Sequence, residues 1–252
     1  MDGASNVSDP PRGLALRLMA ALGMVIRIPI ERWIQRASLV STQPFLETDT
    51  FEWIRSIEDA WPEIRAEYDA IRNESIPNIQ DISVLQRYLT TDSLWKTYFF
   101  YGYGFKIETN CRRCPVTAQM LESIPGMKTA FFSVLLPGKL IPPHRGPFRG
   151  LLRYHLAVKV PSPEDTCAIR VGGFQRNWRE GKSLLFDDTY VHEAWNKAES
   201  ERVVLFVDVM RPMTRGATML SEVFLNVMTL SPYVRDAKRR HSAWEATQRG
   251  QG

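Results

Sequence analysis

Histidine is scarce in this chain and concentrated in one stretch. The 252 residues contain four histidines, and three of them, His144, His155 and His192, lie between residues 133 and 212. The fourth, His241, ends a basic KRRH run. Neutral imidazoles are frequent ligands of iron and other transition metals. We interpret His144 and His192 as two ligands of one ferrous iron.

Arginines accompany these histidines on two predicted strands. In the run 151–160, Arg153 and His155 are two residues apart, so their side chains point to the same face of a strand. Arg202 opens a second apolar run at 202–209. A buried guanidinium requires an anionic partner. Two arginines beside two candidate metal ligands therefore predict a small dianionic ligand.

These residues belong to a longer pattern that resembles the catalytic domain of the aspartyl/asparaginyl β-hydroxylases, a branch of the Fe(II)- and 2-oxoglutarate-dependent dioxygenases. The resemblance covers roughly residues 95–212. It is carried by the motifs S-x10-H-x-G-P, R-Y-H-L, F-D-D-x-x-x-H-E-x-W and R-x5-D-V. Each motif alone is weak, and their joint spacing makes the signal specific.

The resemblance implies a role for each matching residue. The iron ligands, and with them the catalytic centre, match His144 and His192. The contacts to the 2-oxoglutarate cosubstrate match Ser133, Arg153, His155 and Arg202. The substrate side matches Trp95, Arg153 and Asp188. The implied reaction uses Fe(II), 2-oxoglutarate and O2 to hydroxylate an unactivated carbon.

The position two residues after the first histidine is informative. Most enzymes of the wider superfamily carry a carboxylate there, which completes a two-histidine, one-carboxylate triad. Here the residue is Gly146, as the resemblance implies for this branch, which leaves that coordination position to water. Ligating histidines also need acceptors that fix the tautomer. Asp187, Asp188 and Glu193 are close enough in sequence to be candidates.

The resemblance leaves the substrate open. The first expectation is an aspartyl, asparaginyl or related amino-acid substrate. The animal enzymes carry a second arginine where this chain has Leu151, and a helical-repeat module for which 252 residues leave no room. The alternative is a lipid acyl chain, because the lipid A acyl-chain hydroxylases share HR-x-P and LRYHL, although they usually carry an acid at the place of Gly146. A third reading is a non-catalytic jelly roll that binds metal and 2-oxoglutarate.

The elements that position these residues are predicted to be short strands. From Lys128 onward apolar residues alternate with a period of two, and Pro- and Gly-containing turns separate the runs. This pattern predicts a mainly β chain with flanking helices and a double-stranded β-helix, or jelly-roll, core. We expect this core at 128–215, with a C-terminal helix and basic tail at 216–252.

The region 37–127 is expected to be helical and to pack on the core. Apolar residues recur at three- and four-residue steps from Phe51 to Ile71, with a boundary at Pro62. The run 93–104 is compatible with either a helix or a strand, because it combines a capping aspartate before it with a series of aromatic residues.

The motif formed by Cys111 and Cys114 lacks the second pair of ligands that a structural zinc site needs. We interpret it as a packed or solvent-facing loop before a helix at 116–124. The chain has three cysteines, too few for a disulfide framework, which favours a reducing, cytoplasmic compartment.

The N-terminal segment 1–36 is predicted to be disordered at its start and then amphipathic and basic, since it carries five arginines and one glutamate. Its longest uncharged run has nine residues, whereas a spanning helix needs about 20. Residues 13–36 could lie on an anionic membrane or pack on the chain's own core. The net charge of +4 is modest. We expect a peptide, amino-acid-like or lipid partner and no nucleic acid.

Overall fold

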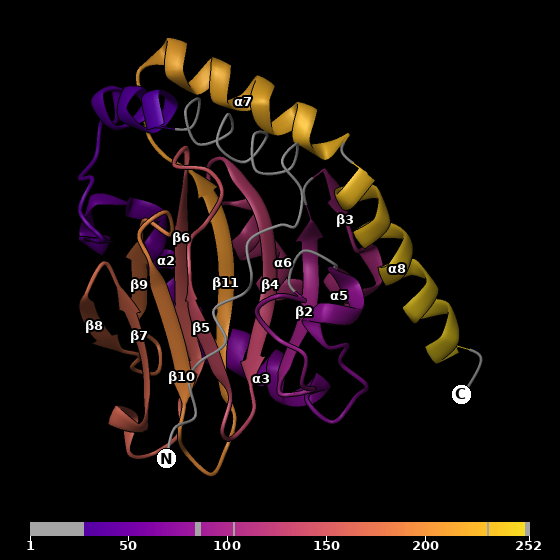
Figure 1. Cartoon of the computed structure of the whole chain (residues 1–252). Coiled ribbons are helices and arrows are strands. Elements are labelled where there is room, and N and C mark those ends of the chain that lie inside the picture. Colours follow the sequence, from indigo (N-terminus) through magenta and orange to yellow (C-terminus); the bar gives the residue numbers. More distant parts are fainter. Residues whose placement is uncertain (1–27, 84–86, 103, 231, 250–252) are drawn as a thin grey trace, which may run out of the picture.

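Two antiparallel sheets pack face to face, and helices cover the outside of the larger one (Figure 1). The computed structural model describes residues 28–83, 87–102, 104–230 and 232–249. The larger sheet has seven strands in the order β1-β9-β6-β11-β4-β2-β3, and the smaller has four in the order β5-β10-β7-β8. This arrangement confirms the predicted jelly roll with flanking helices.

The larger sheet is made of β1 (Phe45–Leu46), β2 (Trp95–Gly102), β3 (Phe105–Lys106), β4 (Met127–Leu135), β6 (Leu151–Lys159), β9 (Ser183–Phe186) and β11 (Arg202–Met210). The smaller is made of β5 (Leu140–His144), β7 (Cys167–Val171), β8 (Phe174–Asn177) and β10 (His192–Asn196). The helices are residues 28–37, α2 (Glu52–Asp59), α3 (Trp61–Ile71), α4 (Ile79–Ile82), α5 (Glu108–Arg113), α6 (Pro115–Glu122), α7 (Arg215–Thr229) and α8 (Pro232–Arg249). Two short 3-10 turns lie at Thr48–Thr50 and Glu164–Thr166.

The alternation in β6 separates two cores. Leu152, Tyr154 and Leu156 face the core beneath the helices, where the Trp61 indole of α3 donates a hydrogen bond to the Val158 carbonyl at 3.1 Å. The opposite face of β6 is turned toward the smaller sheet and carries His155. The predicted two-faced strand is confirmed, and its polar face lies between the sheets.

The aromatic run at 93–104 forms β2, which pairs with β4 in the larger sheet. Tyr98 and Phe100 join the core beneath the helices, so burial of alternate aromatic side chains stabilises the extended conformation. The sheet therefore includes strands that precede residue 128. The division of the chain into regions at that residue stays a prediction.

The two cysteines of the C-x-x-C motif are buried free thiols. Cys111 lies in α5, and Cys114 lies at the junction of α5 and α6. Burial raises the pKa of the Cys114 thiol to about 12. The prediction that these cysteines are packed is confirmed, whereas the predicted loop is wrong, because Cys111 lies within a helix and Cys114 between two helices.

The N-terminal segment is described only from residue 28. The membrane prediction for residues 13–36 and the disorder prediction fall largely on residues 1–27, which lie outside the described residues. Residues 28–37 form a helix that packs Ile34 and Ala37 against Met213 and Ala217. Among the described helices, none has the length and apolar character needed to cross a bilayer.

Candidate active site

The two histidines predicted to bind iron face each other across neighbouring strands. His144 is the last residue of β5 and His192 the first of β10, and they are paired in register with ring centroids 4.0 Å apart. The Nδ1 atom of His144 lies 2.9 Å from the Pro142 carbonyl, and that of His192 lies 3.0 Å from the Tyr190 carbonyl. A carbonyl only accepts, so each Nδ1 carries the proton and each Nε2 keeps a lone pair. Nε2 is therefore the ring nitrogen of each histidine that has a lone pair for a ligand.

This arrangement corrects one expectation. Both tautomers are fixed by backbone carbonyls, whereas the nearby carboxylates are engaged by arginines. Asp187 pairs with Arg211 at 2.6 Å, and Glu193 pairs with Arg170 at 2.6 Å. The proposed carboxylate contacts to the histidines are therefore wrong, because cationic partners compete for these acids.

Burial holds both imidazoles in the neutral form. It lowers the pKa of His144 to about 4 and that of His192 to about 3. Neutral imidazole is the form that binds a metal. In the described part of the chain, no group of three or more His, Cys, Asp or Glu side chains could hold a metal ion. A metal at this place would thus have two protein ligands, which fits the glycine at residue 146.

Asp188 lies against Gly146. The Gly146 amide donates a hydrogen bond to the Asp188 backbone carbonyl at 2.7 Å, and a Cβ at residue 146 would overlap the Asp188 carboxyl group. Arg153 pairs with Asp188 at 2.8 Å and with Asp208 at 3.0 Å, and its guanidinium lies 4.4 Å from the centre of the Phe206 ring. Burial raises the pKa of Asp188 to about 6, and the Arg153 charge opposes this shift.

The other end of the site holds a buried arginine. Arg202 is 2% exposed, and it donates a hydrogen bond to the Ser133 carbonyl at 3.3 Å. No salt bridge to a carboxylate is found for it in the described residues. Burial lowers its pKa to about 9, and a desolvated cation of this kind favours an anionic ligand. The Trp95 indole donates to the Ser133 hydroxyl at 3.1 Å.

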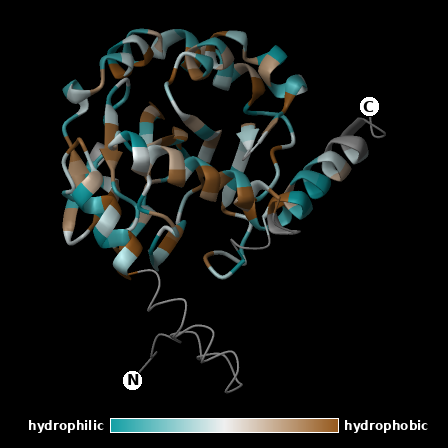
Figure 2. Cartoon of the chain, turned by 90° about the horizontal axis from the view of Figure 1, so that it is seen from above, coloured by the Kyte–Doolittle hydropathy of each residue, from teal (hydrophilic) through white to brown (hydrophobic). Residues whose placement is uncertain are grey.

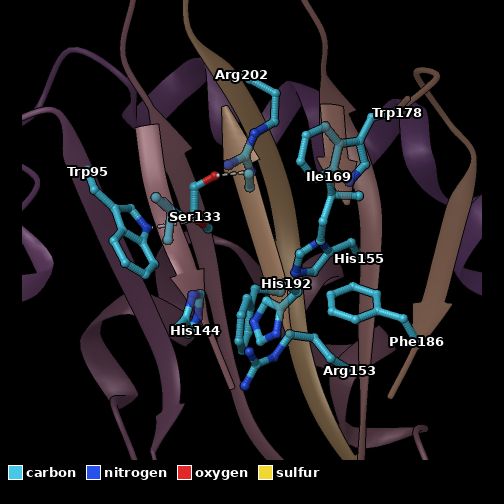
Figure 3. Close-up of a pocket in the computed structure, with 13 residues that line it drawn as sticks. Trp95, Ser133, His144, Arg153, His155, Ile169, Trp178, Phe186, His192 and Arg202 are labelled. Atoms are coloured by element: carbon cyan, nitrogen blue, oxygen red, sulfur yellow. Dashed lines mark hydrogen bonds between the residues drawn. The ribbon is translucent and has the colours of Figure 1, made fainter. Parts of the chain in front are cut away.

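One pocket between the sheets joins these two ends. Figure 3 shows Arg202 at one end, the histidine pair with Arg153 at the other, and His155 between them. Several buried polar atoms here have no hydrogen-bond partner: both ring nitrogens of His155, Nε1 of Trp178 and Nε of Arg202. Buried polar groups are normally satisfied. These atoms therefore fit a polar ligand that lies along the pocket.

The pocket brings together seven of the eight predicted site residues: Trp95, Ser133, His144, Arg153, His155, His192 and Arg202. The eighth, Asp188, joins them through Arg153. Trp95 was expected on the substrate side, but its contact to Ser133 puts it near Arg202. Sequence reasoning missed Trp178, whose ring lies 4.6 Å from the Arg202 guanidinium. It follows β8 outside any strand, so no periodicity marks it.

The comparisons with known proteins place this jelly roll among the hydroxylases. The chain belongs to the aspartyl/asparaginyl beta-hydroxylase family, whose sequence model matches residues 58–212. The predicted family is thereby confirmed.

Two relatives show the range of this family. The chain is 41% identical over 222 residues to the ornithine lipid ester-linked acyl 2-hydroxylase of Rhizobium tropici, which covers 86% of this chain and 79% of that protein. It is 31% identical over 175 residues to the human aspartyl/asparaginyl beta-hydroxylase, which covers 66% of this chain but only 22% of that protein. The chain thus spans most of the first relative and less than a quarter of the second.

Solved structures give weaker likenesses. A prolyl-4-hydroxylase from Pseudomonas putida is 15% identical with a TM-score of 0.39, and it covers 63% of this chain and 98% of its own. A cupin domain from an Enterobacter cloacae transcriptional regulator is 12% identical with a TM-score of 0.33, and it covers 46% of this chain and 96% of its own.

Proposed function

We propose that this hydroxylase depends on Fe(II) and 2-oxoglutarate and that it hydroxylates a carbon of a lipid acyl chain. The observation that carries the cofactor assignment is the pairing of the two ends of one pocket. Two neutral imidazoles, each held at Nδ1 by a backbone carbonyl, lie at one end, and Arg202, whose charge no carboxylate balances among the described residues, lies at the other. A metal-chelating acid with a second, distant carboxylate is complementary to both ends.

Each residue of the pocket then has a task. His144 and His192 would hold the iron, which supplies, with 2-oxoglutarate and O2, the oxidising power to insert one oxygen atom into an unactivated C–H bond and to release succinate and carbon dioxide. Arg202 and the Ser133 hydroxyl bind the distal carboxylate of the cosubstrate by charge-assisted hydrogen bonds. His155 satisfies one of its free nitrogens on the cosubstrate.

The remaining side chains of the pocket hold the charged groups in place and exclude water. Arg153 is fixed between Asp188 and Asp208, so its guanidinium keeps one orientation at the metal-binding end. Trp178 covers the Arg202 guanidinium and is itself 1% exposed. A dry, preorganised pocket strengthens each of these electrostatic contacts and keeps bulk water from the reacting carbon.

We favour a lipid over an aspartyl or asparaginyl substrate. The Rhizobium tropici relative, which aligns over 86% of this chain and 79% of its own length, is named as an acyl 2-hydroxylase of a lipid. Leu151 also stands where the resemblance implies a second arginine in the animal enzymes, so a carboxylate-bearing side chain would lack that cation here. The aminoacyl substrate remains the second candidate, because the family includes the human aspartyl/asparaginyl enzyme.

The test is an assay with a choice of substrates. Purified protein is incubated with Fe(II), 2-oxoglutarate and air, and with an ornithine-containing acyl ester lipid, lipid A, or peptides containing aspartate and asparagine. We expect succinate release coupled to a gain of one oxygen atom in an acyl chain, measured by mass spectrometry. Oxygen gain in a peptide alone would establish the second candidate. Binding of 2-oxoglutarate without succinate from any substrate would support the non-catalytic reading.

A further inference from the structure

Helix α7 exposes an apolar surface that the described part of the chain does not cover. Met219, Leu220, Val223, Val227 and Leu230 are between 54% and 70% exposed, and we call them the α7 apolar face. Such a contiguous exposed patch usually marks an interaction surface. The helix lies across one end of the sandwich (Figure 1).

The α7 apolar face is not the side by which the helix packs. The helix is anchored on the fold by Ala217, Ser221 and Leu225, which recur every four residues and are buried. On its other flank Glu222 and Asn226 form a polar stripe. At 100° per residue, the α7 apolar face points away from the buried side and adjoins this stripe. The part of α7 that is exposed to solvent therefore has an apolar side and a polar side.

This surface lies at the same end of the sandwich as the histidine pair. Strand β11 ends at Met210, shortly before α7, and Met210 is in register with Leu151 at the start of β6. The loop between His144 and β6 contacts α7, because the Phe148 and Phe224 rings lie 4.7 Å apart. Arg145 of the same loop pairs with Glu31 of the helix at residues 28–37 at 3.5 Å.

Basic residues are exposed on α7 and on the helices next to it. Arg215 is exposed at the start of α7, and Arg32 and Arg36 are exposed on the neighbouring helix. Arg235 and Lys238 are exposed on α8, which continues from α7. Figure 2 looks down on this end and shows hydrophobic turns along α7 and mostly hydrophilic ones on α8. An exposed apolar face on a helix whose own start and neighbouring helices carry exposed cations complements a bilayer with anionic headgroups.

We infer that the α7 apolar face docks on an anionic phospholipid bilayer and thereby brings the histidine end of the pocket to the membrane surface. This inference rests on the proposed function, since a lipid-acyl hydroxylase must meet its substrate at a membrane. It differs from the N-terminal membrane contact considered from sequence, because the anchoring side chains are in α7. The bound helix lies in the plane of the headgroups and buries its apolar side chains below them.

The test is vesicle flotation of the full-length protein without iron or 2-oxoglutarate. Vesicles contain either phosphatidylcholine alone or equal parts of phosphatidylglycerol and phosphatidylcholine, and no substrate lipid. We expect flotation with the anionic vesicles, weaker flotation with the neutral ones, and release at high salt. Val223→Glu should lower the partition coefficient on the order of tenfold, because it removes one buried apolar side chain and adds a repelled charge.

The matched control is Gln175→Glu, which adds the same charge at an exposed position of β8, outside α7. It should float within about twofold of the wild type, since a single charge outside the bilayer contact is screened by salt. Equal melting temperatures for both variants exclude a folding defect. Equal flotation of Val223→Glu and the wild type, or no flotation of the wild type with anionic vesicles, would overturn the inference.

Two alternatives to bilayer docking by the α7 apolar face give distinct results, and either result would overturn the inference. If a second copy covers the face, the wild type sediments as a dimer that Val223→Glu converts to a monomer, without flotation. If residues 1–27 supply the anchor, their deletion abolishes flotation whereas Val223→Glu does not. The proposed function is judged separately, because turnover of detergent-dispersed lipid needs no bilayer. Loss of flotation with normal turnover in detergent refutes docking alone, and flotation without turnover refutes the proposed function alone.

Discussion

The Asp188 carboxylate occupies the space that a side chain at residue 146 would need. A Cβ on Gly146 would overlap the carboxyl carbon and both carboxylate oxygens of Asp188. Asp188 is buried and paired with Arg153, so it has little freedom to move aside. The glycine is therefore required by the acid that packs against it, in addition to leaving a metal position open.

Gly146→Ala should impair the site without unfolding the protein. The displaced Asp188 loses its pairing with Arg153, and we expect 2-oxoglutarate affinity and turnover to fall on the order of tenfold. Calorimetric titration of 2-oxoglutarate and the succinate assay measure the two effects. The control is Gly216→Ala, whose Cβ would meet no atom within 4 Å. Wild-type kinetics in Gly146→Ala would show that Asp188 has room to move.

The Cys114 thiol should be unreactive in the native protein. Burial raises its pKa to about 12 from an ordinary value of 9.0, and only the thiolate is nucleophilic. At about pH 8 we expect alkylation by iodoacetamide to be at least about 100-fold slower than in urea. Peptide mass spectrometry after timed quenching gives the rate at each cysteine. Alkylation of the folded protein at the rate seen in urea would contradict the burial of this thiol.

The same shift predicts a pH dependence of stability. An acid whose pKa is higher in the folded state stabilises the fold fully below its unfolded pKa and loses that contribution as pH rises through the folded value. The contribution of Cys114 should therefore decline between about pH 9 and about pH 12. Urea unfolding of Cys114→Ala should show a shallower loss of stability over this window than the wild type. Parallel pH profiles would refute the assignment.

Sequence periodicity predicted the strands that carry long apolar alternations and missed the short ones that carry the histidines. β6 and β11 each contain nine residues with two distinct faces. β5 contains Pro142 and Pro143, which lower its strand propensity. It tolerates them because it is the edge strand of the smaller sheet. The site residues in these short strands were found through motif spacing and family resemblance.

The contacts that lie outside any repeating pattern could not be predicted. The carbonyls of Pro142 and Tyr190 fix the histidine tautomers, and a backbone acceptor has no signature in the sequence. Trp178 meets Arg202 only because the chain turns after β8. Which acid pairs with which arginine depends on register between distant strands, as for Arg153 and Asp208.

Trp95 should act on the cosubstrate and not on the lipid. Its indole donates to the Ser133 hydroxyl and so fixes one of the groups assigned to the distal carboxylate. Trp95→Phe keeps most of the ring and removes this hydrogen bond, which is worth about 1 kcal/mol. We expect the KM for 2-oxoglutarate to rise about fivefold, with an unchanged KM for the lipid. A change in the lipid KM alone would return Trp95 to the substrate side.

Arg202 should contribute to the binding of 2-oxoglutarate while it lowers the stability of the ligand-free protein. Its pKa of about 9 lies below the ordinary value of 12.5, so at neutral pH the guanidinium is charged in both the folded and the unfolded state, and the folded state bears the cost of desolvation. Arg202→Met should therefore raise the free energy of unfolding of the ligand-free protein by about 1–3 kcal/mol. The same substitution should weaken 2-oxoglutarate binding at least about 100-fold, because the distal carboxylate loses its cation.

Urea unfolding with and without 2-oxoglutarate measures both effects of Arg202→Met in one experiment, because a ligand that binds only the folded state raises its stability. The wild type should gain stability on addition of the ligand and the variant should not. Arg55→Met, at an exposed position on α2, is the control and should behave as the wild type in both conditions. A ligand-free Arg202→Met protein that is less stable and still responds to 2-oxoglutarate would mean that the guanidinium serves the fold itself. The cosubstrate assignment would then lose its principal support, since no other buried, carboxylate-free arginine among the described residues lines the pocket.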